Sequence, residues 1–196
     1  GNPRCTTRRA VDRATCVSAV ARASSECAAA CTGGGGGSES PPAPATGPTW
    51  DGKAPFSCTR GSHTFTNVNA NVRGVALSIQ GTCSVILRNS NLEGSAAAVD
   101  ISGSARLVVQ GGSLTGGLAG VSSSGSSDVD LDATRVSGKT AISASGSSSV
   151  DVNNGTSLTG SPVAINASGS ATIDIARGAK VTGSIETTGN ASVNRD

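Results

Sequence analysis

The sequence is poor in aromatic residues, and this limits the kind of core that it can build. Its 196 residues include two Phe, one Trp and no Tyr, against 27 Gly. Aromatic side chains dominate the buried area of many cores. A core of this chain must therefore consist of Val, Ile, Leu and Ala in a regular arrangement, because without such regularity the chain would be disordered.

Charge and long hydrophobic runs are also scarce. Charged residues make up 14% of the chain, the formal net charge is +2, and no basic stripe alternates with aromatics. These features argue against nucleic acid as a partner. No apolar stretch approaches the roughly 18 residues that span a bilayer, so no membrane span is expected.

Methionine is absent, and the first residues are Gly1-Asn2-Pro3. We therefore expect that a targeting segment has been removed, with a trimmed expression product as the alternative. The six cysteines lie among Gly, Ser and Thr and lack the CxxC pairs of zinc modules. An even number of such cysteines is typical of disulfide-bonded proteins outside the cytoplasm, so the expected location is extracellular or at the cell surface.

Residues 1–31 are predicted to form a helical segment that contains cysteine. From about Thr6 to Ala30 the chain is rich in Ala, Arg and Val and lacks Gly and Pro. The cysteines of this segment are Cys5, Cys16, Cys27 and Cys31. On one continuous helix Cys16 and Cys27 would lie about 16 Å apart, beyond disulfide reach. Either the segment folds back as a helical hairpin or these cysteines bond elsewhere, including to another subunit, so their pairing stays open.

Residues 32–49 are predicted to be a linker. The run Gly33–Gly37 is flexible, and the proline-rich stretch after it is stiffer and more extended. Such a linker would let the N-terminal segment swing free, or reach along its own domain or along that of a neighbour.

Residues 50–196 contain an internal repeat of about 22 residues. One element alternates apolar residues over 84–87 and returns at 106–109, 128–131, 149–152, 172–175 and 192–194. Two further apolar elements in each repeat are followed by glycine, as at Gly94 and Gly103. Three short strands in each repeat predict one rung of a three-sided parallel β-helix, an all-β fold. Stacking rungs about 4.8 Å apart would align the apolar residues into interior ladders.

This repeat resembles that of right-handed parallel β-helix proteins, an architecture also found in pectate lyases, autotransporter passengers and phage tailspikes. The resemblance covers roughly residues 58–196 and implies the fold and its handedness. It involves the repeat pattern and none of the catalytic motifs of these families.

Three residues at the start of the repeat region have predicted structural roles. Cys58 and Cys83 lie about one rung apart, so a disulfide between them would join the first rung to the second. Trp50 is expected to cap the open first rung. The single histidine, His63, is expected to be a surface residue rather than a catalyst.

An outward column is predicted along the first strand of each rung. It consists of Ile86, Val108, Asp130, Asp151, Asp174 and Asn194. Ile86 and Val108 would form an exposed apolar patch, and the N-terminal helix is the expected cover for this assembly patch.

The aspartates of the same column are the only candidates for metal or acid chemistry. Asp130, Asp151 and Asp174 could supply carboxylate ligands for calcium, or the paired carboxylates of a glycosidase. The simpler interpretation is a solvated acidic face that discourages lateral association of sheets. We therefore expect no metal, no cofactor and no catalytic residue.

The chain stops at Asp196, just after the beginning of another first strand, and no C-terminal cap follows. Such an end is expected to accept another copy head to tail, which would generate an open filament. The sequence thus favours a secreted structural protein of an extracellular filament, coat or surface appendage, and not an enzyme. One alternative is a monomeric adhesin or carbohydrate-binding module with surface polysaccharide as its partner, and another is a polysaccharide lyase or hydrolase.

Overall fold

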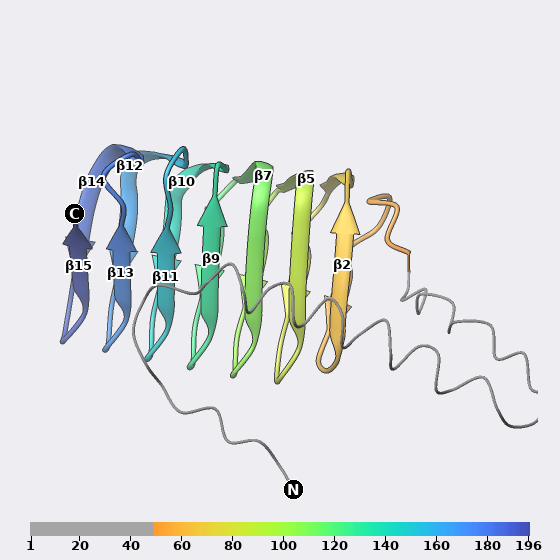
Figure 1. The fold of residues 1–196 in the computed structure, drawn as a ribbon, viewed down its shortest axis with the longest axis horizontal. Helices are drawn as coiled ribbons and strands as arrows, with labels where there is room; N and C mark the ends of the chain where they lie inside the picture. The colour runs from red at the N-terminus through yellow and green to blue at the C-terminus, as the bar shows by residue number, and fades with distance from the viewer. Residues whose placement is uncertain (1–48) are drawn as a thin grey trace, which may run out of the picture. The chain divides into compact units, whose positions relative to one another are not determined.

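A computed structural model of the protein describes residues 49–196, which form an all-β parallel solenoid of about six turns with about 22 residues per turn (Figure 1). The predicted helical segment 1–31, its four cysteines and the linker as far as residue 48 lie outside the described residues. In chain order the strands are β1 (Phe56–Cys58), β2 (Ser62–Thr66), β3 (Asn69–Val72), β4 (Val75–Ile79), β5 (Ser84–Gly94), β6 (Ala97–Ile101), β7 (Arg106–Gly116), β8 (Ala119–Ser123), β9 (Asp128–Asp132), β10 (Arg135–Ala144), β11 (Ser149–Val152), β12 (Ser157–Ala167), β13 (Thr172–Ile175), β14 (Lys180–Thr187) and β15 (Ser192–Arg195).

The strands pair in three parallel ladders, each of which joins equivalent segments of successive turns. The first ladder contains β2, the start of β5 and of β7, and then β9, β11, β13 and β15. The second contains β3, the ends of β5 and β7, and the starts of β10, β12 and β14. The third contains β1, β4, β6, β8 and the ends of β10, β12 and β14.

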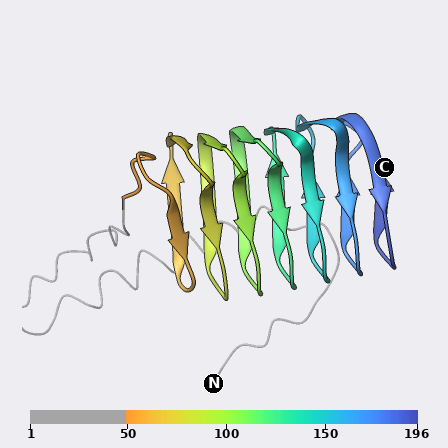
Figure 2. The same ribbon diagram turned by 180° about the vertical axis from the view of Figure 1, so that it is seen from behind.

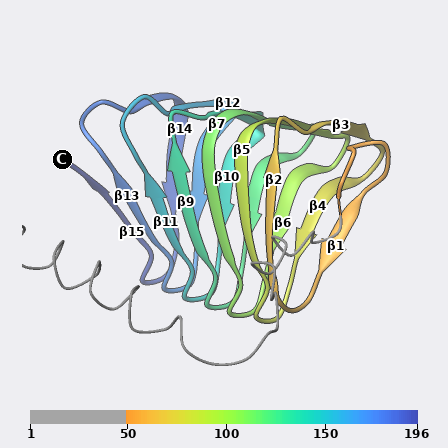
Figure 3. The same ribbon diagram turned by 45° about the vertical axis from the view of Figure 1, so that its right-hand side comes forward.

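The order of the turns in space follows the order of the chain. Figure 1 shows the strands of the first ladder side by side from β2 to β15, and Figure 2 shows the same succession from behind. In Figure 3 the connections of successive turns lie one behind another along the solenoid. The predicted repeat and its parallel stacking are therefore confirmed.

Some of the predicted short strands are continuous in the structure. β5 and β7 run through both the first and the second ladder. The bend within each strand occurs at residues with positive φ, which are Asn89 (46°) in β5 and Gly111 (76°) and Gly112 (93°) in β7. A Cβ at Gly112 would overlap the backbone oxygen of Ser90, so glycine is required there. The chain can thus turn at this point without leaving the sheet.

The interior is filled by aliphatic side chains that stack in register. The first ladder stacks Val85, Leu107, Val129, Val150 and Ile173, and the third stacks Leu77, Val99, Val121, Ile142 and Ile165, all fully buried. No single turn could shield these side chains, because each turn contributes only one residue to each stack. Burial is therefore a property of the stack.

A few polar side chains are also buried, at the bends between the first and second ladders. Ser90, Thr134 and Thr156 are at most 1% exposed. Their hydroxyl groups donate to backbone oxygens, as from Thr134 to Asp132 at 2.8 Å and from Thr156 to Leu131 at 3.1 Å. These bonds satisfy carbonyl groups at the corner, where the regular ladder is interrupted.

The first turn is closed by an aromatic cluster and a disulfide. Trp50 packs against Phe56 and Phe65, with ring centroids 5.7 and 5.4 Å away, and its Nε1 donates to the carbonyl of Ala54 at 2.8 Å. The predicted disulfide between Cys58 and Cys83 is present, with the two Cα atoms 6.0 Å apart. It links the first turn to the second covalently.

The alternation of inward and outward residues can be tested with two neighbours in β7. Leu107→Ala removes a fully buried side chain and should lower the free energy of unfolding by about 2–5 kcal/mol. Val108→Ala alters a partly exposed side chain and should cost under about 1 kcal/mol. Chemical denaturation of both variants measures the difference. Equal losses, or a larger loss at Val108, would contradict the assigned alternation.

Candidate functional site

The outward column of the first ladder is the candidate site that the sequence indicates. The structure places its members in register, one per turn, and adds Thr64 of β2 at its beginning. In order, the column contains Thr64, Ile86, Val108, Asp130, Asp151, Asp174 and Asn194. The side chains of neighbouring turns are thus brought next to one another, although they lie about 22 residues apart in the sequence.

The apolar part of this column consists of Ile86 and Val108. The two residues are directly paired between β5 and β7, and both are partly exposed. Polar residues flank them on the same strands, with Arg106 before Val108 by two positions and Arg88 after Ile86 by two. The pair is therefore a small apolar area within a polar surface, and its role in assembly stays a prediction.

A second apolar side chain on the surface was not indicated by the sequence. Leu118, between β7 and β8, is 58% exposed and is the only large hydrophobic residue among 49–196 that is fully open to solvent. It lies in a turn, where the alternation of the strands does not apply, so its exposure could not be predicted from the repeat.

The acidic part of the column is bounded by groups that neutralise some of its charge. Arg106 contacts Asp128 at 3.0 Å and Asp130 at 2.6 Å. At the other end, the amide of Asn194 donates to Asp174 Oδ1 at 2.7 Å. Asp151 lies between Asp130 and Asp174, and within residues 49–196 it has no cation at ion-pair distance.

The environment of Asp151 disfavours its charged form. Partial burial raises the pKa of its carboxyl, and the negative charges of Asp130, Asp174 and Asp128 raise it further. Carboxylates in one column recur about every 4.8 Å, which is close enough for repulsion. Calcium prefers six to eight oxygen ligands, and a single open column supplies few of them. Calcium binding and acid catalysis at Asp130, Asp151 and Asp174 stay predictions.

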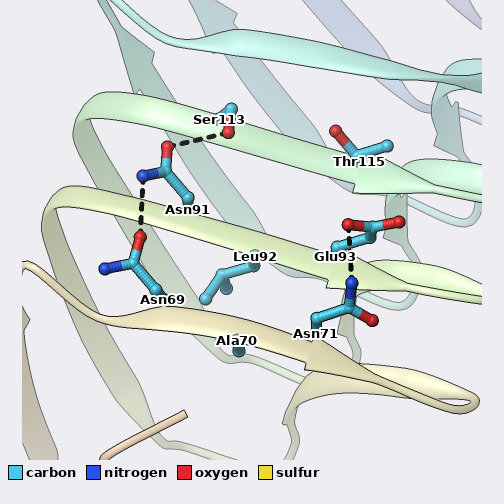
Figure 4. Close-up of a pocket in the computed structure, with 8 residues that line it drawn as sticks. All are labelled: Asn69, Ala70, Asn71, Asn91, Leu92, Glu93, Ser113 and Thr115. Atoms are coloured by element: carbon cyan, nitrogen blue, oxygen red, sulfur yellow. Dashed lines mark hydrogen bonds between the residues drawn. The ribbon is translucent and has the colours of Figure 1, made fainter.

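A shallow groove of about 250 Å³ lies on the outward surface of the second ladder (Figure 4). Along one side, Asn91 donates to Asn69 Oδ1 at 2.9 Å and Ser113 donates to Asn91 Oδ1 at 2.8 Å. On the other side, Asn71 donates to Glu93 Oε2 at 3.0 Å. These columns of amides and hydroxyls come from β3, β5 and β7. Their sequence signal was the outward Asn in successive repeats, which the sequence reasoning did not use.

The same outward column becomes basic farther along the solenoid. Arg135, Ser157 and Lys180 are in register with one another and line a second hollow of about 370 Å³. Neither Arg135 nor Lys180 forms an ion pair with an acidic residue of the described part of the chain. The second ladder therefore presents amides at one end and free cations at the other.

His63 is not the simple surface residue that the sequence suggested. It is in register with the fully buried Val85, so the alternation of β2 turns its side chain inward. Its ring stacks parallel to that of Phe65, with centroids 6.0 Å apart, and is only partly exposed. The surface prediction was wrong because a polar residue occupies a position that carries aliphatic residues in the later turns.

No family model, curated protein or solved structure matches this sequence. Residues 49–196 contain no helix of the length and hydropathy needed to cross a bilayer. Function must therefore be inferred from the surfaces of the solenoid itself.

The pKa of Asp151 predicts a stability that changes with pH. Because this pKa is raised above its ordinary value of 3.8, the folded protein binds more protons than the unfolded chain between these two values. Stability attributable to Asp151 should therefore rise as the pH falls through this window. Asp151→Asn, which removes the charge, should stabilise the protein by about 0.5 kcal/mol at neutral pH.

Denaturation at several pH values measures this effect, and the gain should vanish below a pH of about 3.8. Asp100→Asn is the matched control, since Asp100 is also outward but pairs with Ser78 and Ser122. An Asp151→Asn variant that is no more stable than the parent at neutral pH would show that repulsion within the column is negligible.

Proposed function

We propose that the chain is a secreted structural subunit that associates with further copies of itself in an extracellular filament, coat or surface appendage. The disulfide between Cys58 and Cys83 supports a location outside the reducing cytoplasm. The repeated turns form a body whose stability comes from neighbour-to-neighbour stacking, which suits a mechanical role.

The observation that carries this proposal is the partly exposed apolar pair of Ile86 and Val108 on a strand ladder. Apolar side chains on the flat outer surface of a sheet gain stability when another element covers them. The N-terminal segment of a neighbouring copy is the proposed cover, because its sequence includes Val11, Val17 and Val20 and a linker of suitable reach precedes the solenoid. The acidic column beyond Val108 would limit how far that contact extends.

An axial contact is the second element of the proposal. Within residues 49–196, β14 pairs only with β12 and β15 pairs only with β13, so each has one free edge. The strands of another copy would extend the ladders there by the same hydrogen bonds that join successive turns. A contact of this kind uses different surfaces on the two copies, so its repetition would give a head-to-tail filament.

We also propose that the three ladders are the three sides of the solenoid. The first side then carries the apolar pair and the acidic column, and the second carries the groove of amides and the basic hollow. In this arrangement Asp130, Asp151 and Asp174 form a solvated face that keeps neighbouring solenoids from pairing edge to edge, with no catalytic step assigned to them.

Binding of a surface polysaccharide is a second candidate function, favoured by the outward surface of the second ladder. Asn69, Asn91 and Ser113 offer amide and hydroxyl groups at the spacing of the turns. Arg135 and Lys180 could contact acidic sugars. A monomeric adhesin would use this surface without any self-association.

Electron microscopy of the unreduced protein tests the polymer. Filaments or ordered oligomers are expected at high protein concentration, whereas uniform short monomers would contradict the proposal. The double variant Ile86→Lys, Val108→Lys should abolish association, because two cations replace the apolar pair. Ser122→Lys is the matched control, since Ser122 is an outward residue of the third ladder and should leave association intact.

A glycan array tests the second candidate. Asn91→Ala removes both hydrogen bonds that Asn91 makes and should weaken binding to neutral glycans about tenfold. Lys180→Ala should weaken binding to acidic glycans by a similar factor. Asn166→Ala, an exposed residue of β12 in the third ladder, is the control. Unchanged binding in both test variants would exclude this surface as the binding site.

A further inference from the structure

Three side chains with metal-binding groups meet at the first turn of the solenoid. Cys58 ends β1, His63 belongs to β2, and Cys83 directly precedes β5. The two sulfur atoms and one ring nitrogen of His63 all lie within 4.8 Å of one another. In the structure the two cysteines are joined as a disulfide, which leaves the imidazole beside it without a role in the staple.

The imidazole of His63 has an unsatisfied polar atom. Its Nδ1 is buried and has no hydrogen-bond partner among the described residues. Buried nitrogen atoms normally have a partner, and an orphan of this kind calls for an explanation, such as a bound ion. This observation is independent of the closeness of the two cysteines.

Aromatic packing fixes the orientation of this ring. Phe65 lies parallel to it at 6.0 Å, and Phe56 meets it edge to face at 5.4 Å between centroids. A ligand whose rotamer is already set loses little freedom when it binds a metal. Cys58 and Cys83 are buried while His63 is partly exposed, so one side of the cluster can be reached from solvent.

We propose that the reduced form of the protein binds one zinc ion through Cys58, Cys83 and His63. Thiolate and imidazole are the ligands that zinc favours, and three protein ligands leave a fourth position for water. Zn–S bonds of about 2.3 Å place the two sulfurs about 3.8 Å apart, which is a small opening from the disulfide and requires side-chain rotation only.

The chemistry needs an external reductant of the dithiol or phosphine class. The reductant supplies two electrons, the S–S bond breaks, and two protons complete the thiols of Cys58 and Cys83. Zinc then displaces both thiol protons, which pass to solvent, and takes the lone pair of the neutral imidazole. Metal and disulfide are thus alternative staples between the first and second turns, one for reducing and one for oxidising conditions.

The test uses the full chain with Cys5, Cys16, Cys27 and Cys31 replaced by serine, so that only the pair at the first turn can respond. The protein is reduced with a phosphine under nitrogen and titrated with Zn²⁺, and separately with Co²⁺ as a spectroscopic probe. We expect one equivalent to bind, a thiolate-to-cobalt charge-transfer band to appear, and Zn²⁺ to raise the unfolding temperature of the reduced protein but not of the oxidised protein.

His63→Val is the decisive variant, because Val85 occupies the same inward position in the next turn. Its zinc affinity should fall more than about 100-fold, beyond the 10–100-fold that loss of an outer-shell partner costs. The oxidised His63→Val protein should unfold close to the temperature of the oxidised parent, which checks that the fold is intact. If the oxidised variant is unfolded, His63→Gln replaces it in the same comparison.

Two results would overturn the inference. One is a reduced parent whose unfolding temperature does not change with Zn²⁺. The other is a folded His63 variant that binds zinc as tightly as the parent. If the reduced parent is unfolded without metal, recovery of the fold on addition of Zn²⁺ supports the site and failure to recover contradicts it.

Discussion

Stacking of aliphatic side chains between successive turns is the interaction on which this structure depends. A single turn contributes one or two apolar residues to each ladder and cannot shield them from water. Leu107 is fully buried because Val85 lies on one side and Val129 on the other. With so few aromatic residues, the chain has no other source of a core, so the repeat length and the parallel register must be kept in every turn.

The same constraint leaves the outward residues free to vary, and this is where any function must lie. Along the first ladder the outward position changes from Ile86 and Val108 to aspartates, and along the second ladder it changes from amides to Arg135 and Lys180. None of these changes disturbs the interior, because outward side chains pack only on their neighbours in the column. A solenoid can therefore carry an association surface and a ligand surface on separate ladders.

The repeat made the fold predictable from sequence. The spacing of Val85, Leu107 and Val129 predicted both the length of a turn and the inward face, and the distance between Cys58 and Cys83 predicted the disulfide. The continuity of β5 and β7 was missed, because the positive φ of Asn89 and Gly111 cannot be told from an ordinary turn signal.

The parts of the site that escaped prediction depend on contacts across turns. The groove at Asn69 and Asn91 arises only when residues 22 positions apart are paired. His63 appeared to be a surface residue because the later turns have aliphatic residues at its position, and its closeness to Cys58 and Cys83 depends on the path of the chain through the first turn. Sequence spacing alone does not contain that path.

Methyl–methyl nuclear Overhauser effects measure the central claim, the register of the stack, most directly. In a protein with labelled Val, Leu and Ile methyl groups, Leu107 should show cross-peaks to Val85 and Val129, which lie in the adjacent turns. Cross-peaks from Leu107 to Ile86, or the absence of any between residues one turn apart, would contradict the in-register solenoid.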